Sequence, residues 1–403
     1  MSFPPSPSPR LTGGRLVALT VAVLFAAAMM RAPIVAVAPV ADEVEAALGI
    51  TPAVVGLFTS IPVLAFALCS PLAVAIIRRG GADFALSVCL IGGIAGTLVR
   101  SAGSLAAALV GTAIIGLFLT IGNVVVPLII AREFPPERVQ VMSGVYASAL
   151  NVGTMTVTIA TAPLATGIGW QGAIAVWAGF GLVALGVWIG LHGLRGALVP
   201  ARPALAQRPR GSSGILRVPT TWLLAAAFAG QSFCFYGMTA WLPSLLAAQG
   251  FGGTAAGAIS AVFQVGGIAG ALTLPLVTTR FSIAAGVVAA AVGWVILPLG
   301  FLVAPELWLL WCIVGGLAQG AGFTVVIILI TALGGGVHAI AGRSGFVQGA
   351  GYALAATGPV ALGALHEVTG AWAVPLVVVF AAGAMFGIAG ILVALPLRRR
   401  PAR

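Results

Sequence analysis

A single arginine lies inside an apolar stretch that is long enough to cross a membrane. Arg31 comes sixteen residues after Arg15, and Pro33 follows two residues later. At roughly 1.5 Å of rise per residue this separation is ~24 Å of helix, which places Arg31 well inside a bilayer. No Asp or Glu occupies the middle of any apolar stretch of the chain. Because a buried guanidinium needs an acceptor, we expect Arg31 to line a cavity and to bind an anion or an electron-rich polar solute.

Uncharged polar side chains also occur near mid-membrane depth, and they could complete a binding shell around Arg31. The same groups can instead link helices, at about 0.6–2 kcal/mol each. For Asn123, Gln264 and Gln319 both interpretations stay open, whereas the position of Gln231 in an internal repeat favours the site. The candidate substrate-binding residues are therefore Arg31, Asn123, Tyr146, Asn151, Gln231, Tyr236, Gln264, Gln319, Gln348 and Tyr352.

The composition identifies the class of protein. Of 403 residues 60% are hydrophobic and only 7% are charged, and the mean hydropathy is +1.15. A soluble domain has about 25% charged residues, so this is an all-α protein of many membrane spans. All 19 basic residues are arginines, and the formal net charge is +11. Because these arginines lie mostly in short loops between apolar runs, they indicate membrane topology rather than nucleic-acid binding.

Twelve apolar runs have the length of a transmembrane helix. We predict spans at 15–40, 52–77, 84–103, 106–131, 139–165, 172–194, 219–246, 253–278, 282–303, 306–332, 341–365 and 372–396. Residues 1–14 are rich in Pro and Ser and are predicted to be disordered. The remaining chain divides into a six-helix half at 15–195, a cytoplasmic linker at 196–218, a second six-helix half at 219–397 and a basic tail at 398–403.

The loops between these spans differ in charge from one side to the other. One side carries the arginine-containing loops, with Arg78, Arg79, Arg132, Arg138, Arg195, Arg202, Arg208, Arg210, Arg217, Arg280, Arg343, Arg398, Arg399, Arg400 and Arg403. The other side has Arg100 as its only arginine and also carries Asp42, Glu43, Glu45, Glu306, His366 and Glu367. The positive-inside rule therefore predicts that both termini are cytoplasmic. Trp241 falls on the outer side, where we expect it to anchor the chain at the membrane interface.

The two halves resemble each other at a shift of about 200 residues. Arg31 falls opposite Gln231, and Arg79 falls opposite Arg280 at a shift of 201. Two six-helix halves with a site between them at mid-membrane are typical of a secondary transporter that rocks around its substrate.

The residues usually found in cofactor, metal or catalytic sites are not assembled. Each of Cys69, Cys89, Cys234 and Cys312 lies in an apolar span without metal-site spacing, which favours core packing. No nucleotide-binding loop and no catalytic set of carboxylate, His or Ser/Lys at a membrane surface is visible, so we predict neither an enzyme nor a primary pump. We expect no cofactor, no metal and no nucleic-acid partner.

Four motifs resemble a known family. They read Arg31-Ala-Pro33 in the first span, Gly122-Asn-Val-Val-Val-Pro127 in the fourth, Gly230-Gln-Ser-Phe-Cys-Phe-Tyr-Gly-Met-Thr-Ala-Trp241-Leu-Pro243 in the seventh and Ser344-Gly-Phe-Val-Gln348-Gly-Ala-Gly351-Tyr352 in the eleventh. Together they resemble the cyanate/2-nitroimidazole transporter family of the major facilitator superfamily, over nearly the whole chain. The resemblance implies that spans 1, 4, 7 and 10 line the cavity, with 2, 5, 8 and 11 beside them. One departure is that the loop after the second span has no Asp before Asp83, where the superfamily usually carries one.

These observations predict a monomeric carrier in the bacterial inner membrane that moves a small anion by alternating access, with Arg31 as its anchor. The alternative is an efflux carrier for nitroimidazole-like or other small aromatic compounds, which should tolerate Arg31→Ala. The direction of transport and the coupling ion stay open, because no Asp, Glu or His lies in mid-span. The acidic cluster Asp42, Glu43 and Glu45 lies near the membrane surface at best.

Overall fold

The structure is a computed structural model that describes residues 13–201, 217–334 and 336–399. Within these ranges the regular elements are all helices, so the predicted all-α membrane fold is confirmed. The predicted tails at 1–14 and 398–403 and the predicted linker at 196–218 lie partly outside the described residues.

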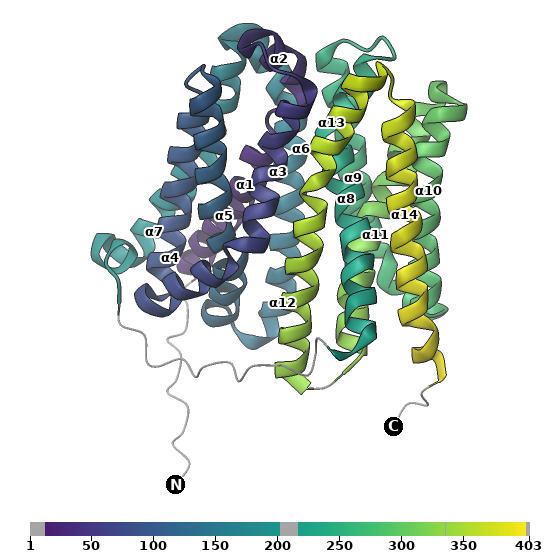
Figure 1. The fold of residues 1–403 in the computed structure, drawn as a ribbon. Helices are drawn as coiled ribbons and strands as arrows, with labels where there is room; N and C mark the ends of the chain where they lie inside the picture. Colours follow the sequence, from purple (N-terminus) through teal and green to yellow (C-terminus); the bar gives the residue numbers. More distant parts are fainter. Residues whose placement is uncertain (1–12, 202–216, 335, 400–403) are drawn as a thin grey trace.

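The helices form two bundles that stand side by side (Figure 1). The N-terminal half consists of α1 (Gly13–Val35), η1 (Ala38–Val40), α2 (Ala41–Leu48), α3 (Pro52–Leu68), α4 (Ser70–Arg100), α5 (Leu105–Glu133), α6 (Pro136–Ala175) and α7 (Ala178–Leu198). The C-terminal half consists of α8 (Pro219–Ala247), α9 (Gly253–Arg280), α10 (Ile283–Val303), η3 (Pro305–Leu307), α11 (Trp308–Ala332), α12 (Gly336–Ala355), α13 (Thr357–Thr369), α14 (Ala373–Ala394) and η4 (Leu395–Arg399).

Ten helices within the described ranges are long and apolar enough to cross a membrane. The two other predicted spans, 52–77 and 341–365, are interrupted, because α3 ends at Leu68 and α12 ends at Ala355. Pro71 and Pro359 follow these two ends closely, and neither has the N–H that would continue the helical hydrogen bonds. Each of these two predicted spans therefore consists of two successive helices that are joined at a single residue, Cys69 in the first case and Ala356 in the second.

Two of the long helices are sharply bent at glycines. Gly81 in α4 has φ 83° and ψ 166°, and Gly169 in α6 has φ 72° and ψ 163°. Only glycine adopts this conformation without strain. Each bend separates two predicted spans. The helix α4 contains the end of the second span and most of the third, and α6 contains the fifth span and the start of the sixth.

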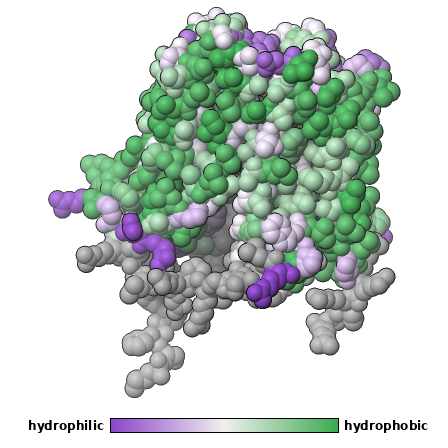
Figure 2. Space-filling model, in the orientation of Figure 1, coloured by the Kyte–Doolittle hydropathy of each residue, from purple (hydrophilic) through white to green (hydrophobic). Residues whose placement is uncertain are grey.

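The middle of the molecule is covered by hydrophobic residues on the face shown in Figure 2, and hydrophilic residues gather mainly at its two ends. We name these ends by their charged residues. The arginine-rich end, at the bottom of Figure 1, includes the side chains Arg78, Arg79, Arg132, Arg195 and Arg280. The acidic end, at the top, includes Asp42, Glu43, Glu45, Glu306 and Glu367.

The two halves meet where α6 packs against α9, and where α3 packs against α12 and α13. At the acidic end their backbones touch. A Cβ atom built on Gly56 of α3 would lie 2.6 Å from the carbonyl oxygen of Pro359, and one built on Gly363 of α13 would lie 2.6 Å from that of Pro52. These contacts leave no room for a side chain, so the two halves are closed against each other here. We call this contact region around Gly56 and Gly363 the outer seam, after the predicted orientation of the acidic end.

An ion-pair network ties three helices of the N-terminal half together at the arginine-rich end. The Arg132 guanidinium on α5 contacts the carboxylates of Asp83 on α4 and Glu133. The indole of Trp188 on α7 donates to the Asp83 carbonyl oxygen at 3.2 Å, and Nε2 of His192 lies 3.9 Å from Asp83 Oδ1. An acidic link between helices is therefore present here, although Asp83 comes later in the loop than the superfamily pattern expects.

Candidate functional site

A cavity of about 640 Å³ lies between the two halves. Its walls come from α1 and α6 of the N-terminal half and from α8, α9, α11 and α12 of the C-terminal half. These correspond to predicted spans 1, 5, 7, 8, 10 and 11. The fourth span, expected to line the cavity, and the second, expected beside it, supply none of the described lining residues. Figure 2 shows the molecule hollowed between the halves toward the arginine-rich end. Because the outer seam is closed, the cavity is accessible from the arginine-rich side.

Arg31 reaches this cavity from α1. Its Nη1 atom donates a hydrogen bond of 2.9 Å to the hydroxyl oxygen of Tyr236 on α8. The guanidinium carbon also lies 5.7 Å from the ring centroid of Phe235 and 5.9 Å from that of Tyr236. Arginine within about 6 Å of an aromatic face gains a favourable electrostatic interaction. Two aromatic residues of the C-terminal half therefore hold a cation of the N-terminal half.

Aromatic rings continue along the wall beyond this pair. Tyr352 of α12 lies 6.3 Å from Tyr236 between ring centroids, 5.1 Å from Phe228 and 5.9 Å from Phe66 of α3. The three contacts are edge-on, which is a preferred arrangement of aromatic rings. Tyr352 thus lines the cavity and packs between the two halves.

The amide of Gln231 faces the cavity but is already engaged by its neighbours. Its Nε2 atom donates to the carbonyl oxygen of Gln319 at 2.8 Å, and its Oε1 atom accepts from the indole of Trp294 at 2.5 Å. These bonds join α8 to α10 and α11. Gln231 therefore links helices, as well as lining the cavity.

Gln319 also lines the cavity, and it differs from Gln231 in having an unused donor. Its side chain is 6% exposed, and its Nε2 atom has no hydrogen-bond partner among the residues that the structure describes. A buried amide N–H without a partner is costly, so an acceptor atom of a substrate would gain from binding there. Gln319 and Arg31 both offer donors to a molecule in the cavity.

The other predicted site residues lie at different distances from this centre. Asn151 lines the cavity, and Tyr146 lies near enough to interact electrostatically with Arg31 while its hydroxyl donates to the Met30 sulfur at 3.6 Å. Tyr146 is not among the lining residues of the cavity, and neither are the remaining three. Asn123 is exposed on α5, Gln264 is buried 3.5 Å from the Thr239 hydroxyl, and Gln348 donates at 2.8 Å to Ser344 of its own helix.

Several lining residues were not among the predicted ones. Phe235 is the most informative, because it lies under the guanidinium of Arg31, and its place beside Tyr236 in the seventh span was the available signal. Ser232, Thr154, Phe323 and Thr324 also line the cavity. A lone Ser, Thr or Phe in a membrane helix is too common to be singled out from the sequence.

The electrostatic character of the cavity follows from what lines it. Among the described lining residues there is one cation, Arg31, and no Asp, Glu or His. The partners shown for the guanidinium are a neutral hydroxyl and two ring faces. The cavity can therefore hold an electron-rich group, and it has no charged group with which to attract a cation.

Comparisons with known proteins agree with this architecture. A family model for the Major Facilitator Superfamily matches residues 18–314. The chain is 32% identical over 391 residues to the 2-nitroimidazole transporter of Escherichia coli (strain K12), covering 95% of this chain and 97% of that protein. It is 27% identical over 359 residues to the cyanate transport protein CynX of the same organism, covering 85% and 88%.

Solved structures show the same fold at low sequence identity. A crystal structure of the nucleoside transporter NupG matches with a TM-score of 0.76 and 11% identity, covering 93% of this chain and 99% of that one. The protein is thus a transporter rather than an enzyme, and it is a multi-pass protein of the bacterial inner membrane. On this evidence the chain belongs to the major facilitator superfamily, where it is related to the cyanate and 2-nitroimidazole transporters.

Proposed function

We propose that this carrier moves a small anion across the membrane by alternating access, with Arg31 as the central anchor. The observation that carries the proposal is the state of the Arg31 guanidinium. It lies in a central cavity whose described lining contains no carboxylate, and its hydrogen-bond partner is the neutral Tyr236 hydroxyl. A charge in a low-dielectric cavity gains most from a counter-charge, and a small anion would supply one.

The geometry also suits alternating access. Arg31 belongs to one half, and the aromatic residues that hold it belong to the other. An anion bound at Arg31 can therefore contact both halves and bias their relative position, which is the requirement for a ligand to shift a conformational equilibrium. The donor Nε2 of Gln319 lies on the C-terminal wall of the same cavity and supports the same substrate class.

A second candidate is efflux of a small nitroaromatic compound, and one observation favours it. Phe235, Tyr236, Phe323 and Tyr352 line the cavity, so a flat aromatic molecule could stack there. The relative that is 32% identical to this chain is named a 2-nitroimidazole transporter. In this version the nitro group would lie at Arg31, but most of the binding free energy would come from the rings.

The experiment is a thermal-shift titration of the purified protein with cyanate, nitrate, formate and 2-nitroimidazole. A ligand of the native state raises the melting temperature, and the stabilisation grows with the logarithm of the ratio of ligand concentration to dissociation constant. Wild type would be compared with Arg31→Ala, Arg31→Lys and the control Arg280→Ala, which removes an exposed arginine at the arginine-rich end.

The anion proposal expects that cyanate or another small anion stabilises wild type and Arg280→Ala, and that Arg31→Ala loses this effect. Arg31→Lys should keep a weaker effect, because it retains the charge but not the planar donor geometry. If no anion stabilises wild type, and 2-nitroimidazole stabilises wild type and Arg31→Ala equally, the anion proposal is wrong and the aromatic candidate replaces it.

A further inference from the structure

A second cavity, of about 290 Å³, lies at the outer seam and is separate from the substrate cavity. It is lined by Asp42 and Glu45 from α2 of the N-terminal half, and by Ser244 and His366 from the C-terminal half. The remaining wall includes two tryptophans, Trp241 and Trp372. Titratable groups of both halves therefore face one space across the closed seam.

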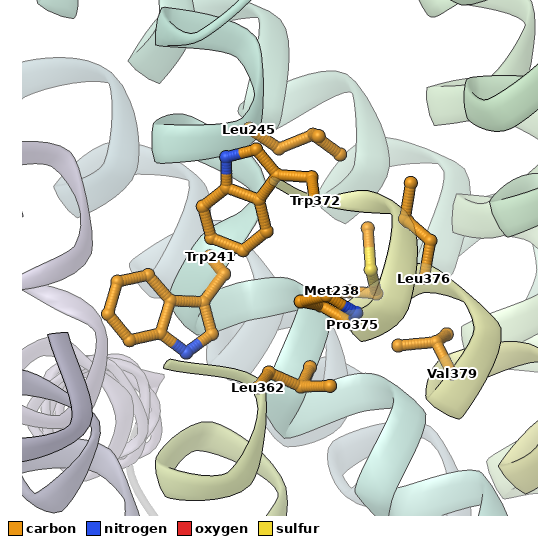
Figure 3. A pocket seen from close by; sticks show the side chains of 8 residues that line it. All are labelled: Met238, Trp241, Leu245, Leu362, Trp372, Pro375, Leu376 and Val379. Carbon is orange, nitrogen blue, oxygen red and sulfur yellow. The ribbon is translucent and has the colours of Figure 1, made fainter. Parts of the chain in front are cut away.

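The C-terminal wall of this cavity is rigid. Trp241, which we expected to anchor at the membrane interface, is instead 3% exposed, and its indole donates to the carbonyl oxygen of Pro359 at 2.7 Å. Figure 3 shows Trp241 and Trp372 among apolar side chains of α8, α13 and α14, and their ring centroids are 5.7 Å apart. The ring of His366 stacks on Trp372 with centroids 4.1 Å apart, and its Nδ1 atom is buried with no hydrogen-bond partner in residues 13–201, 217–334 and 336–399.

The N-terminal wall lies outside the hydrocarbon of the bilayer. The apolar helical stretch from Gly14 to Leu48 has 35 residues. At roughly 1.5 Å per residue it exceeds a ~30 Å hydrocarbon core by about 20 Å. Because charged side chains are costly in hydrocarbon, we place its last part, which carries them, outside the core. That last part is the short helix α2, which carries the acidic residues Asp42, Glu43 and Glu45 and ends at Gly49 in a left-handed conformation.

The charged and titratable groups that face Glu45 come from two elements. Asp42 lies on its own helix, and His366 and Glu367 lie on α13 of the other half. His366 shares the cavity with Glu45, Glu367 interacts with Glu45 electrostatically, and Glu43 of α2 is exposed and does not line the cavity. Among the described lining residues of this cavity there is no arginine. Burial raises the pKa of Glu45, the nearby carboxylates of Asp42 and Glu367 act in the same direction, and together these causes bring it to about 7.

We propose that Glu45 is a proton-binding site that couples proton uptake to closure of the outer seam, so that acid on this side holds the carrier closed there. This inference rests on the proposed alternating-access function, because it assumes that the seam opens in the transport cycle. Closing the seam brings Glu45 toward Glu367 of the other half, and two carboxylates brought together favour a state in which one carries a proton. The bound species is a proton, and no other ligand is required.

The direction of the pH effect follows from linkage. In the closed state Glu45 has a raised pKa of about 7, with burial as the largest cause. When the seam opens, Glu45 moves away from Glu367 and becomes hydrated, so its pKa falls toward the ordinary value. The closed state therefore binds more protons between these two values, and the ratio of closed to open molecules rises as the pH falls through this window, by up to about tenfold per pH unit.

The test measures the width of the seam directly. Spin labels would be placed at Ala46→Cys on α2 and Val368→Cys on α13, both exposed positions in different halves. Cys69→Ser would remove the one native cysteine that is not buried. Pulsed electron-electron distance measurements between pH 8 and pH 5 would then be compared for the background protein, Glu45→Gln, Glu367→Gln and Glu43→Gln. Glu43→Gln is the matched control, because Glu43 is exposed and does not line this cavity.

We expect the short-distance population of the background protein to grow as the pH falls from 8 to 5. Glu45→Gln should keep the short distance at every pH, because the amide imitates the protonated acid. Glu367→Gln should move the midpoint to lower pH, since one source of repulsion is gone, and Glu43→Gln should match the background protein. A distance distribution that is independent of pH in the background protein, or equal pH responses of Glu45→Gln and Glu43→Gln, would overturn the proposal.

The result of the label-distance experiment can be told apart from the result of the thermal-shift titration. If anions stabilise the carrier through Arg31 but the label distances across the seam do not change with pH, only the proposed proton site is wrong. If the seam responds to pH through Glu45 but no anion binds, the proton site stands and the proposed substrate class is wrong.

Discussion

Arg31 of the N-terminal half donates a 2.9 Å hydrogen bond to the hydroxyl of Tyr236 in the C-terminal half. The two residues are separated by 205 positions in the chain, and they meet because α1 and α8 both reach the central cavity. This bond joins the two bodies that must move relative to each other in alternating access. A substrate that binds Arg31 can therefore compete with Tyr236 for the guanidinium or bind beside it, and these two possibilities have different consequences.

Tyr236→Phe tests whether anion binding needs the Tyr236 hydroxyl. The variant keeps the ring near Arg31 but removes the acceptor, so it should lower the free energy of unfolding by about 1–2 kcal/mol in the absence of substrate. We expect anions to stabilise it as they stabilise wild type, because Arg31 is intact. Thermal melts with and without anion measure both effects.

Tyr146→Phe is the control for this comparison, since the Tyr146 hydroxyl donates only a long bond to the Met30 sulfur. If Tyr236→Phe instead loses the anion effect as completely as Arg31→Ala, the Tyr236 hydroxyl binds the anion itself.

Glycines of the outer seam should control which side of the carrier is open. In Gly363→Ala the new Cβ would lie 2.6 Å from the carbonyl oxygen of Pro52 and 2.6 Å from a ring carbon of Trp241. Such crowding costs about 1–3 kcal/mol. The contact with Pro52 crosses the seam and applies only while the seam is closed, whereas the contact with Trp241 lies within the C-terminal half. We therefore expect a population shift toward molecules open at the acidic end, measured as longer distances between labels at Ala46 and Val368.

Gly349→Ala is the matched control, because nothing lies within 4 Å of a Cβ built at this glycine of α12. It should leave the label distances unchanged. Equal distances in Gly363→Ala and in the background protein would mean that the seam can absorb a methyl group and does not act as a close-packed gate.

The fold could be predicted from the sequence because its main determinant is simple. A membrane-spanning helix must be apolar for about 20 residues, and this requirement is visible without knowing any contact. The interruptions after Leu68 and Ala355 were less visible, since Pro71 and Pro359 stand inside runs that remain apolar throughout. Membrane helices often tolerate proline, so its presence alone does not predict a break.

The site was predictable only in part, for a similar reason. Arg31 could be identified because its charge lies at mid-span, and the structure places it in the cavity. The partners of Gln231 could not be identified, because they depend on how α8, α10 and α11 are rotated about their own axes. The indole of Trp294 lies 63 residues from Gln231 in the chain, and no pattern in either helix marks the pair.

Gln231→Leu tests whether this amide is chiefly structural. It would leave the Trp294 indole and the Gln319 carbonyl without their partner, at a cost of about 1–3 kcal/mol in the free energy of unfolding. We expect a lower melting temperature and an anion-induced shift close to that of wild type. Gln348→Leu should change little, since Gln348 bonds only to Ser344 of its own helix.

A different result would reassign Gln231. If Gln231→Leu melts like wild type but no longer responds to anions, its amide contributes to substrate binding rather than to helix packing. Its position opposite Arg31 in the internal repeat would then reflect a shared role in the site.

Arg100 differs from Arg31 in that it is buried and its guanidinium has no partner within the described residues. It is 1% exposed near the end of α4, and none of its three guanidinium nitrogens has a hydrogen-bond partner in the described part of the chain. A buried charge without a partner is costly. We therefore expect Arg100→Met, which keeps the length of the side chain, to raise the free energy of unfolding by about 1–4 kcal/mol.

Chemical and thermal unfolding of Arg100→Met beside the control Arg280→Met would measure this difference. Arg280 is exposed, and its replacement should change stability by less than about 0.5 kcal/mol. A lower stability of Arg100→Met would mean that the guanidinium has a counter-charge from outside the chain. The phosphate of a lipid headgroup at the acidic end is the first group to test, because adding anionic lipid should then stabilise wild type and leave Arg100→Met unchanged.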